Sequence, residues 1–167
     1  MTVRQLPAAD RTAAPWRNGG GVTREVAAAP DGSWRVSLAE VAADGPFSVF
    51  PGLDRVLTVV DGPGLELTVG DRPPIAVHPL RPFAFPGDLP TTGRLLPSPP
   101  AGPVTALNLM TRHGHPATVE MPTTGADLRP AAGRTQLAVA LEGHDALLVS
   151  HPSTAPAPPG PFVLLTF

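Results

Sequence analysis

The chain of 167 residues contains no cysteine, no lysine and no tyrosine, and only 5% of its residues are aromatic. Without cysteine it forms no disulfide, no thiolate metal site and no thiol nucleophile. All twelve basic residues are arginines, which excludes chemistry that needs a lysine, such as Schiff-base formation or phosphate binding by a Walker A lysine. These absences remove several classes of cofactor enzyme before any motif is considered.

Runs of basic residues and long apolar runs are missing as well. The formal net charge is -2, whereas binding to a nucleic-acid backbone requires clustered cations. No stretch approaches the roughly 20 apolar residues of a membrane span, and the first residues lack the apolar core of a secretory signal. We therefore expect a soluble, cytoplasmic protein that has neither a nucleic-acid nor a membrane partner.

What the sequence does contain is short runs of β-branched and aliphatic residues, separated by turn signals. The 17 glycines and 24 prolines are spread along the chain, and proline interrupts nearly every window in which a helix could form. The spacing of about ten residues per run predicts an all-β sandwich or barrel. The expected strands are 22–27, 34–41, 55–60, 65–69, 75–78, 104–110, 117–121, 136–141, 146–150 and 162–167.

A chain of this length and composition can bury one core of moderate size, so we expect one compact unit spanning residues 1–167. The proline-rich segment 96–103 cannot enter the interior of a sheet. It predicts a join between two approximate halves, 1–96 and 104–167.

The most unusual stretch is Trp16-Arg17-Asn18-Gly19-Gly20-Gly21-Val22-Thr23-Arg24-Glu25. Three consecutive glycines lose much conformational entropy on folding and offer no side chain for packing, so the structure must require them. A loop whose backbone N–H groups approach an anionic ligand is one explanation. A loop pressed against a neighbouring strand is the other, and the residues alone leave both open.

The strand after the glycines alternates between two faces that are both mixed in polarity. Val22, Arg24 and Val26 share one face. If the valines mark the interior, Arg24 enters it with them, and a buried guanidinium needs a carboxylate partner or an anionic ligand. Asp54 and Glu40 are the candidate partners.

Three further clusters follow in the chain: Phe47-Ser48-Val49-Phe50-Pro51-Gly52-Leu53-Asp54-Arg55, Phe85-Pro86-Gly87-Asp88 and Leu107-Asn108-Leu109-Met110. Together with the glycine motif, and in this order, they resemble the HutD/Ves family over residues 16–112. The first two motifs are long and specific, and the C-terminal third matches only in its general strand pattern.

The resemblance implies a cupin-like β-barrel or sandwich with duplicated, bicupin-type halves. It also implies a regulatory role in histidine utilisation, without a cofactor, in which a small carboxylate such as urocanate or a formylated amino acid is bound. Matching positions give the candidate ligand-binding residues Trp16, Arg17, Asn18, Thr23, Arg24, Glu25, Phe47, Asp54, Arg55 and Asn108.

Two positions depart from the family pattern. Ala106 stands where related chains usually carry an acidic residue, so a proton-transfer role is lost there, and His113 stands where a further arginine is frequent. The leading hypothesis is a binding protein that catalyses no reaction. A metal-dependent cupin-type enzyme is the alternative, with His113, His115 and Glu120 as candidate ligands. A third possibility is a structural role for the glycine loop and the charges in barrel closure or homodimer formation.

Overall fold

A computed structural model describes residues 2–97, 102–121 and 125–167 of the chain. Within these ranges it contains fifteen β-strands and one short 3-10 helix, η1 (Ala8–Asp10), so the predicted all-β class is confirmed. The described residues include no helix with the length and apolar character needed to cross a bilayer. The chain divides into two compact units, which are described separately below.

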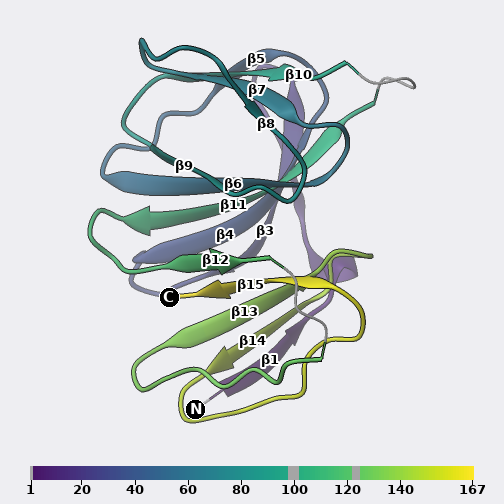
Figure 1. The fold of residues 1–167 in the computed structure, drawn as a ribbon, viewed down its shortest axis with the longest axis vertical. Helices are drawn as coiled ribbons and strands as arrows, with labels where there is room; N and C mark the ends of the chain where they lie inside the picture. The colour runs from purple at the N-terminus through teal and green to yellow at the C-terminus, as the bar shows by residue number, and fades with distance from the viewer. Residues whose placement is uncertain (1, 98–101, 122–124) are drawn as a thin grey trace. The chain divides into compact units, whose positions relative to one another are not determined.

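The larger unit, Thr12–Gly114, consists of two antiparallel sheets. The six-stranded sheet has the order β2 (Ala13–Pro15), β3 (Gly21–Ala28), β4 (Trp34–Val41), β11 (Val104–Arg112), β6 (Leu53–Asp61) and β9 (Phe83–Pro86). The four-stranded sheet has the order β5 (Gly45–Phe47), β10 (Thr91–Leu95), β7 (Leu65–Val69) and β8 (Ile75–Val77). Figure 1 shows β9, β6, β11 and β4 as neighbouring strands of the larger sheet.

One apolar core joins the two sheets of this unit. Alternate residues of β6, among them Leu57 and Val59, pack with Leu65 and Leu67 of β7, and all four are almost completely buried. Because side chains alternate along a strand, the same alternation places Arg55 on the inner face with Leu57. The core therefore fixes which β6 side chains point inward.

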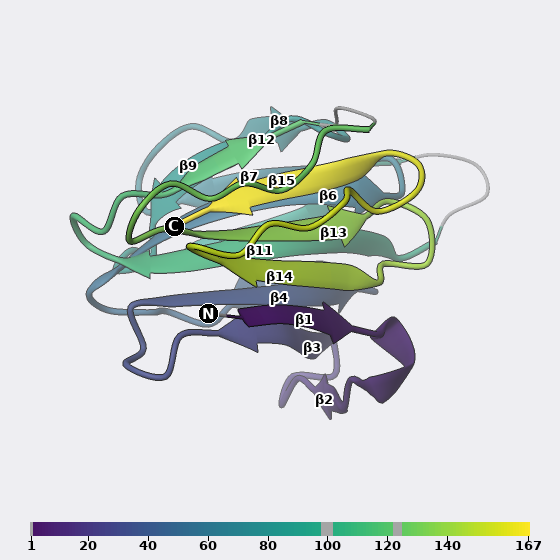
Figure 2. The ribbon, with the colours of Figure 1, turned by 90° about the horizontal axis from the view of Figure 1, so that it is seen from below.

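The smaller unit contains the remaining described residues, 2–11, 115–121 and 125–167. It has one antiparallel sheet with the order β1 (Thr2–Leu6), β14 (Ala146–Ser150), β13 (Thr135–Ala140), β15 (Phe162–Thr166) and β12 (Thr118–Glu120). Figure 2 shows these five strands side by side. The N-terminal strand thus pairs with a strand near the C-terminus, with Thr2 opposite Ser150.

These units differ from the predicted halves 1–96 and 104–167. The strand after the proline-rich segment, β11, lies between β4 and β6 in the sheet of the larger unit, so the segment connects two strands of one unit. Residues 98–101 of the segment lie outside the described residues. The larger unit has two sheets and the smaller unit has one. The expectations of duplicated, bicupin-type halves and of a single compact unit remain predictions.

Candidate functional site

A cavity of about 490 Å³ opens within the larger unit, between the inner face of the six-stranded sheet and strand β5. Seven of the ten sequence-predicted residues line it: Trp16, Arg17, Asn18, Thr23, Phe47, Arg55 and Asn108. Its other lining residues are Ala14, Pro15, Arg35, Ser37, Ala39, Val41, Pro46, Ser48, Phe50, Leu57, Ala106 and Met110. The glycine-rich motif and the Phe47–Arg55 motif therefore meet at one cavity.

Trp16 forms one wall of this cavity and is held in place by the strand that follows it. Its indole Nε1 donates a hydrogen bond to Oγ1 of Thr23 at 2.8 Å. A Cβ atom at Gly21 would lie 3.0 Å from the indole ring and 2.5 Å from the backbone oxygen of Glu40. Only glycine fits there, so at position 21 the structure supports the explanation in which the loop is pressed against a neighbouring strand.

The rest of the glycine loop is closed by its own hydrogen bonds. The amide of Gly20 donates to Oδ1 of Asn18 at 2.9 Å, and the amide of Gly19 donates to the carbonyl of Trp16 at 3.0 Å. Nδ2 of Asn18 reaches the carbonyl of Pro46 at 3.3 Å. These two amides are thus occupied within the loop, and Asn18 connects the loop to β5.

Phe47 forms the adjoining wall, with its ring edge-on to Trp16 at a centroid distance of 5.8 Å and an angle of 73°. The ring lies over Gly93 of β10, where a Cβ atom would come within 2.5 Å of Cζ. Glycine in a strand interior is unfavourable unless something must approach closely. Here the missing side chain of Gly93 leaves room for the Phe47 ring at the wall of the cavity.

Arg55 is the most unusual group in the cavity, because only 5% of it is exposed. Its guanidinium donates one hydrogen bond, to Oδ1 of Asn108 at 3.0 Å. Its carbon Cζ lies 4.9 Å, 5.2 Å and 5.9 Å from the ring centroids of Phe85, Phe50 and Phe47. Burial lowers the pKa of Arg55 to about 10.

No described carboxylate forms an ion pair with Arg55, and its Nε has no hydrogen-bond partner among the described residues. A buried charge normally requires such a partner. The aromatic rings attract the cation through their faces but accept no hydrogen bond along the guanidinium edge. The Arg55 guanidinium therefore has an N–H group, at Nε, without an acceptor among the described residues, and it lies at the cavity.

Three predicted residues lie away from the cavity. Arg24, which would point inward if Val22 and Val26 marked the interior, does not line the cavity: it is opposite Leu38 of β4, whereas Thr23 is opposite Ala39, which lines the cavity. Opposed residues share a face of the sheet, so Arg24 and Leu38 face away. Neither candidate partner, Asp54 or Glu40, forms an ion pair with Arg24 among the described residues, and Asp54 pairs with His113.

Glu25 is also outside the lining, but it forms an ion pair with Arg35, which lines the cavity. A β-bulge interrupts the register after Glu25, and its carboxylate lies 3.0 Å from Nε of Arg35. Arg35 itself lines the cavity. Arg35 and Ser37 were missed from the sequence, although they are polar residues at alternate positions of the strand, on the same face as Ala39.

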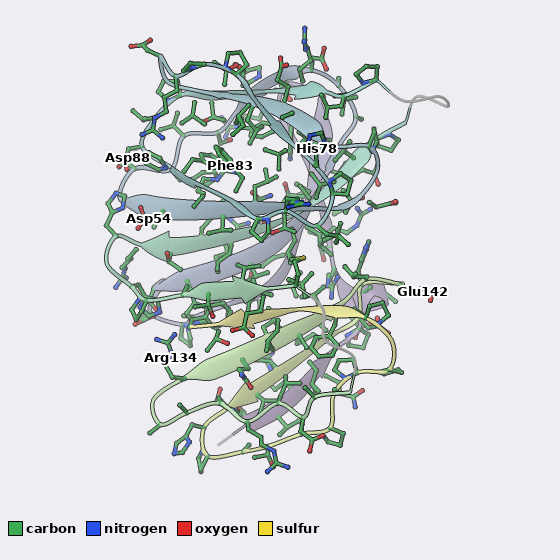
Figure 3. The ribbon with its side chains drawn as sticks, in the orientation of Figure 1. Asp54, His78, Phe83, Asp88, Arg134 and Glu142 are labelled. Carbon is green, nitrogen blue, oxygen red and sulfur yellow. The ribbon has the colours of Figure 1, made fainter. Side chains whose placement is uncertain are left out.

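The two positions that depart from the family pattern have different environments. Ala106 lines the cavity and is completely buried, so a methyl group occupies the place where an acidic side chain is expected. The ring nitrogens of His113 lie 2.8 Å from Oδ1 of Asp54 and 2.8 Å from Oδ2 of Asp88. Figure 3 shows these two aspartates on the same side of the larger unit.

The predicted metal ligands do not form a site. Among residues 2–97, 102–121 and 125–167, no group of three or more histidines, cysteines or carboxylates has a geometry that could hold a metal ion. His113 and His115 fall in different units. The cavity lining contains no histidine and no carboxylate, so its residues do not fit the ligand set of a cupin-type metal.

Two solved structures are similar to this chain over nearly its whole length. HutD from Pseudomonas fluorescens SBW25 is 29% identical, with a TM-score of 0.83, over 98% of this chain and 97% of the other. A conserved protein of unknown function from Pseudomonas aeruginosa PAO1 is 28% identical, with a TM-score of 0.81, over 99% and 97%. These likenesses extend through both units.

A more distant likeness shows the fold alone. Hydroxypropylphosphonic acid epoxidase from S. wedmorenis is 13% identical with a TM-score of 0.52, over 65% of this chain and 58% of the other. The predicted cupin-like fold is thereby confirmed. The HutD family model matches residues 8–157, and the chain therefore belongs to the HutD family.

Proposed function

We propose that the chain binds a small carboxylate in the cavity of the larger unit and catalyses no reaction on it. The observation that carries this proposal is the buried guanidinium of Arg55, which has no carboxylate partner among the described residues. A planar guanidinium offers two parallel N–H groups that match the two oxygens of a carboxylate. A bound carboxylate would supply the negative charge and the acceptors that the site lacks.

The remaining lining residues suit a flat, negatively charged molecule. The volume of about 490 Å³ falls in the ordinary range for small-molecule sites. Trp16 and Phe47 provide aromatic surface next to Arg55, and Arg17 and Arg35 add positive charge. No acidic residue is part of the lining to repel an anion.

The cavity also offers little for catalysis. The lining contains no histidine, aspartate or glutamate, which are the side chains that most often transfer protons. Its hydroxyl groups belong to Thr23, which is engaged with Trp16, and to Ser37 and Ser48. The site therefore suits recognition better than turnover.

Membership of the HutD family supports a role in histidine utilisation, with urocanate or a formylated amino acid as the ligand. In such a role the chain would act in the cytoplasm and report the level of the compound to other components. Both candidate compounds carry a carboxylate, the group that the Arg55 site is suited to hold.

Calorimetry with urocanate, N-formylglutamate and histidine tests the proposal. We expect at least one of the first two to bind, and Arg55→Met to weaken that binding about 30-fold or more, since truncating one member of a buried charge pair costs over 2 kcal/mol. Arg24→Met is the matched control, because Arg24 lies on the same sheet but outside the cavity lining. No heat with any of the three compounds, or equal binding by Arg55→Met, would refute the proposal.

A further inference from the structure

His113 connects two chain segments at one end of the larger unit, outside the cavity lining. Nδ1 of His113 lies 2.8 Å from Oδ1 of Asp54, at the start of β6. Nε2 lies 2.8 Å from Oδ2 of Asp88, in the turn that follows β9. All three side chains are about half exposed, so the contact responds directly to the pH of the solvent.

The geometry is complete only when the imidazole is protonated. An ionised carboxylate accepts hydrogen bonds and donates none, and a neutral imidazole has one N–H. With carboxylate oxygens at both ring nitrogens, a neutral ring must lose one of the two contacts. The hydrogen bond with Asp54, reinforced by Asp88, accordingly raises the pKa of His113 above its ordinary value.

The other charged groups near this contact are occupied elsewhere. Arg112, next to His113 in the chain, donates to the backbone carbonyl of Asp31 in the turn between β3 and β4. Oδ1 of Asp88 accepts the amide of Gly52 at 2.7 Å, and this bond lowers the pKa of Asp88. Asp88 therefore faces His113 as a carboxylate at neutral pH.

The same contact holds the loop between β5 and β6. Asp88 binds the amide of Gly52, and the carbonyl of Gly52 accepts the amide of His113 at 3.1 Å. The loop is thus attached at Gly52 to the two residues that the imidazolium joins. Loss of the Asp88 contact would leave the loop with fewer restraints on this side.

This loop carries Phe50, one of the rings that cover the buried cation. The amide of Phe50 donates to the carbonyl of Gly87 at 2.7 Å, and the amide of Gly87 donates to Leu53 at 2.7 Å. The Phe50 ring lines the cavity, with its centroid 5.2 Å from Cζ of Arg55. The position of the loop therefore sets how completely Arg55 is shielded from water.

We propose that protonated His113 is a positioning residue for the cavity: it joins Asp54 to Asp88, holds Phe50 over Arg55, and so strengthens anion binding at mildly acidic and neutral pH. The inference rests on the proposed function and adds a regulation to it. The contact is complete below the ordinary pKa of histidine and is lost as the pH rises through the higher pKa of the folded state. The lining contains no histidine and no carboxylate, and His113 lies outside it, so a pH dependence that follows His113 originates outside the cavity.

Calorimetry with benzoate at pH 6 and pH 8.5 tests the proposal, because benzoate is a flat carboxylate that does not titrate in this interval. We expect the affinity of the wild-type protein to fall about fivefold, the size of a typical exposed charge contact. His113→Arg provides two N–H donors at every pH, so its affinity should stay high and constant. His113→Gln should bind weakly at both pH values, and the same pH profile in all three proteins would overturn the proposal.

NMR provides a readout that does not depend on the ligand. The amide signals of Gly52 and Phe50 should shift with the midpoint at which His113 titrates, and they should not shift in His113→Arg. If benzoate fails to bind at any pH, these signals still decide whether His113 controls the loop, and the proposed function is decided separately by calorimetry with urocanate and N-formylglutamate. If the amide signals of Gly52 and Phe50 do not shift as His113 titrates, the positioning role is overturned even if benzoate binds.

Discussion

Replacement of Arg55 by methionine removes the charge of the cavity while keeping a long unbranched side chain. Burial lowers the pKa of Arg55 to about 10. A difference of one in pKa corresponds to about 1.4 kcal/mol, so keeping the charge buried destabilises the folded state by about 3 kcal/mol. Since pH 7 lies below both the folded and the unfolded pKa, this destabilisation is fully present at neutral pH.

Two favourable contacts oppose that cost. The hydrogen bond to Asn108 contributes about 1.5–3 kcal/mol as a bond from a charged donor, and the phenyl rings around Cζ add about 1–2 kcal/mol. The contributions nearly cancel, so we expect Arg55→Met to change the free energy of unfolding by less than about 2 kcal/mol. Removing one partner of a buried ion pair that stabilises a fold costs about 3–5 kcal/mol.

Urea unfolding at pH 7 measures this difference, followed by the fluorescence of the two tryptophans. With N-formylglutamate at a hundred times its wild-type Kd, the wild-type protein should gain about 2.7 kcal/mol, and Arg55→Met should gain no more than about 0.9 kcal/mol. Arg24→Met should keep the ligand-dependent gain. A loss above about 3 kcal/mol without ligand would show that Arg55 stabilises the fold, and an undiminished gain in Arg55→Met would place the ligand elsewhere.

Further perturbations test the walls of the cavity and the charge contact beside it. Gly93→Ala places a Cβ atom against the ring of Phe47 and should push the ring into the cavity. Calorimetry should then show that benzoate binds about tenfold more weakly, whereas the smaller acetate binds nearly unchanged. In a Phe47→Ala background, the further change Gly93→Ala should not alter benzoate binding. Thr23→Val removes the acceptor of the Trp16 indole N–H, and urea unfolding should show a loss of about 1 kcal/mol. The pKa of His113 is raised in the folded state, so the melting temperature of the wild type should exceed that of His113→Gln most below about pH 6.5. The two melting temperatures should converge as the pH rises past the folded pKa. A difference that does not change with pH would contradict this.

The longer strands were predictable because burial imposes a period of two on their sequences. The strand Trp34–Val41 was predicted with the bounds that the structure has. The edge strands Ala13–Pro15 and Gly45–Phe47 were not predicted. They are three residues long and contain proline or glycine, so only their pairing with neighbouring strands makes them β-structure.

The cavity was predictable where a long motif fixed both the residue type and the surroundings, as for Trp16, Phe47 and Arg55. It was not predictable from alternation alone. Val26 is buried within a bulge, so its burial says nothing about the face on which Arg24 lies. A bulge shifts the alternation of a strand by one residue, and a single sequence does not reveal where the shift occurs.

The division into units was hidden for a different reason. Proline is unfavourable in the interior of a sheet, so the proline-rich sequence 96–103 resembled a boundary. The strand that follows, β11, nevertheless inserts between β4 and β6. Pairing between strands that are far apart in the sequence depends on which strands complete a shared core. The composition of segment 96–103 therefore does not predict it.

The pairing of β1 with β14 also determines the order in which the chain can fold during synthesis. All strands of the larger unit lie in one continuous segment, Thr12–Gly114, so this unit can complete both sheets as soon as the ribosome has released β11. Strand β1 leaves the ribosome first but has no partner until Ala146–Ser150 has been made. Throughout that interval its backbone N–H and C=O groups are free to pair with other chains, as those of any unpaired edge strand are. Only Val3 and Leu6 of this strand are apolar, and its other three residues, Thr2, Arg4 and Gln5, are polar, a composition that disfavours aggregation while the strand is unpaired.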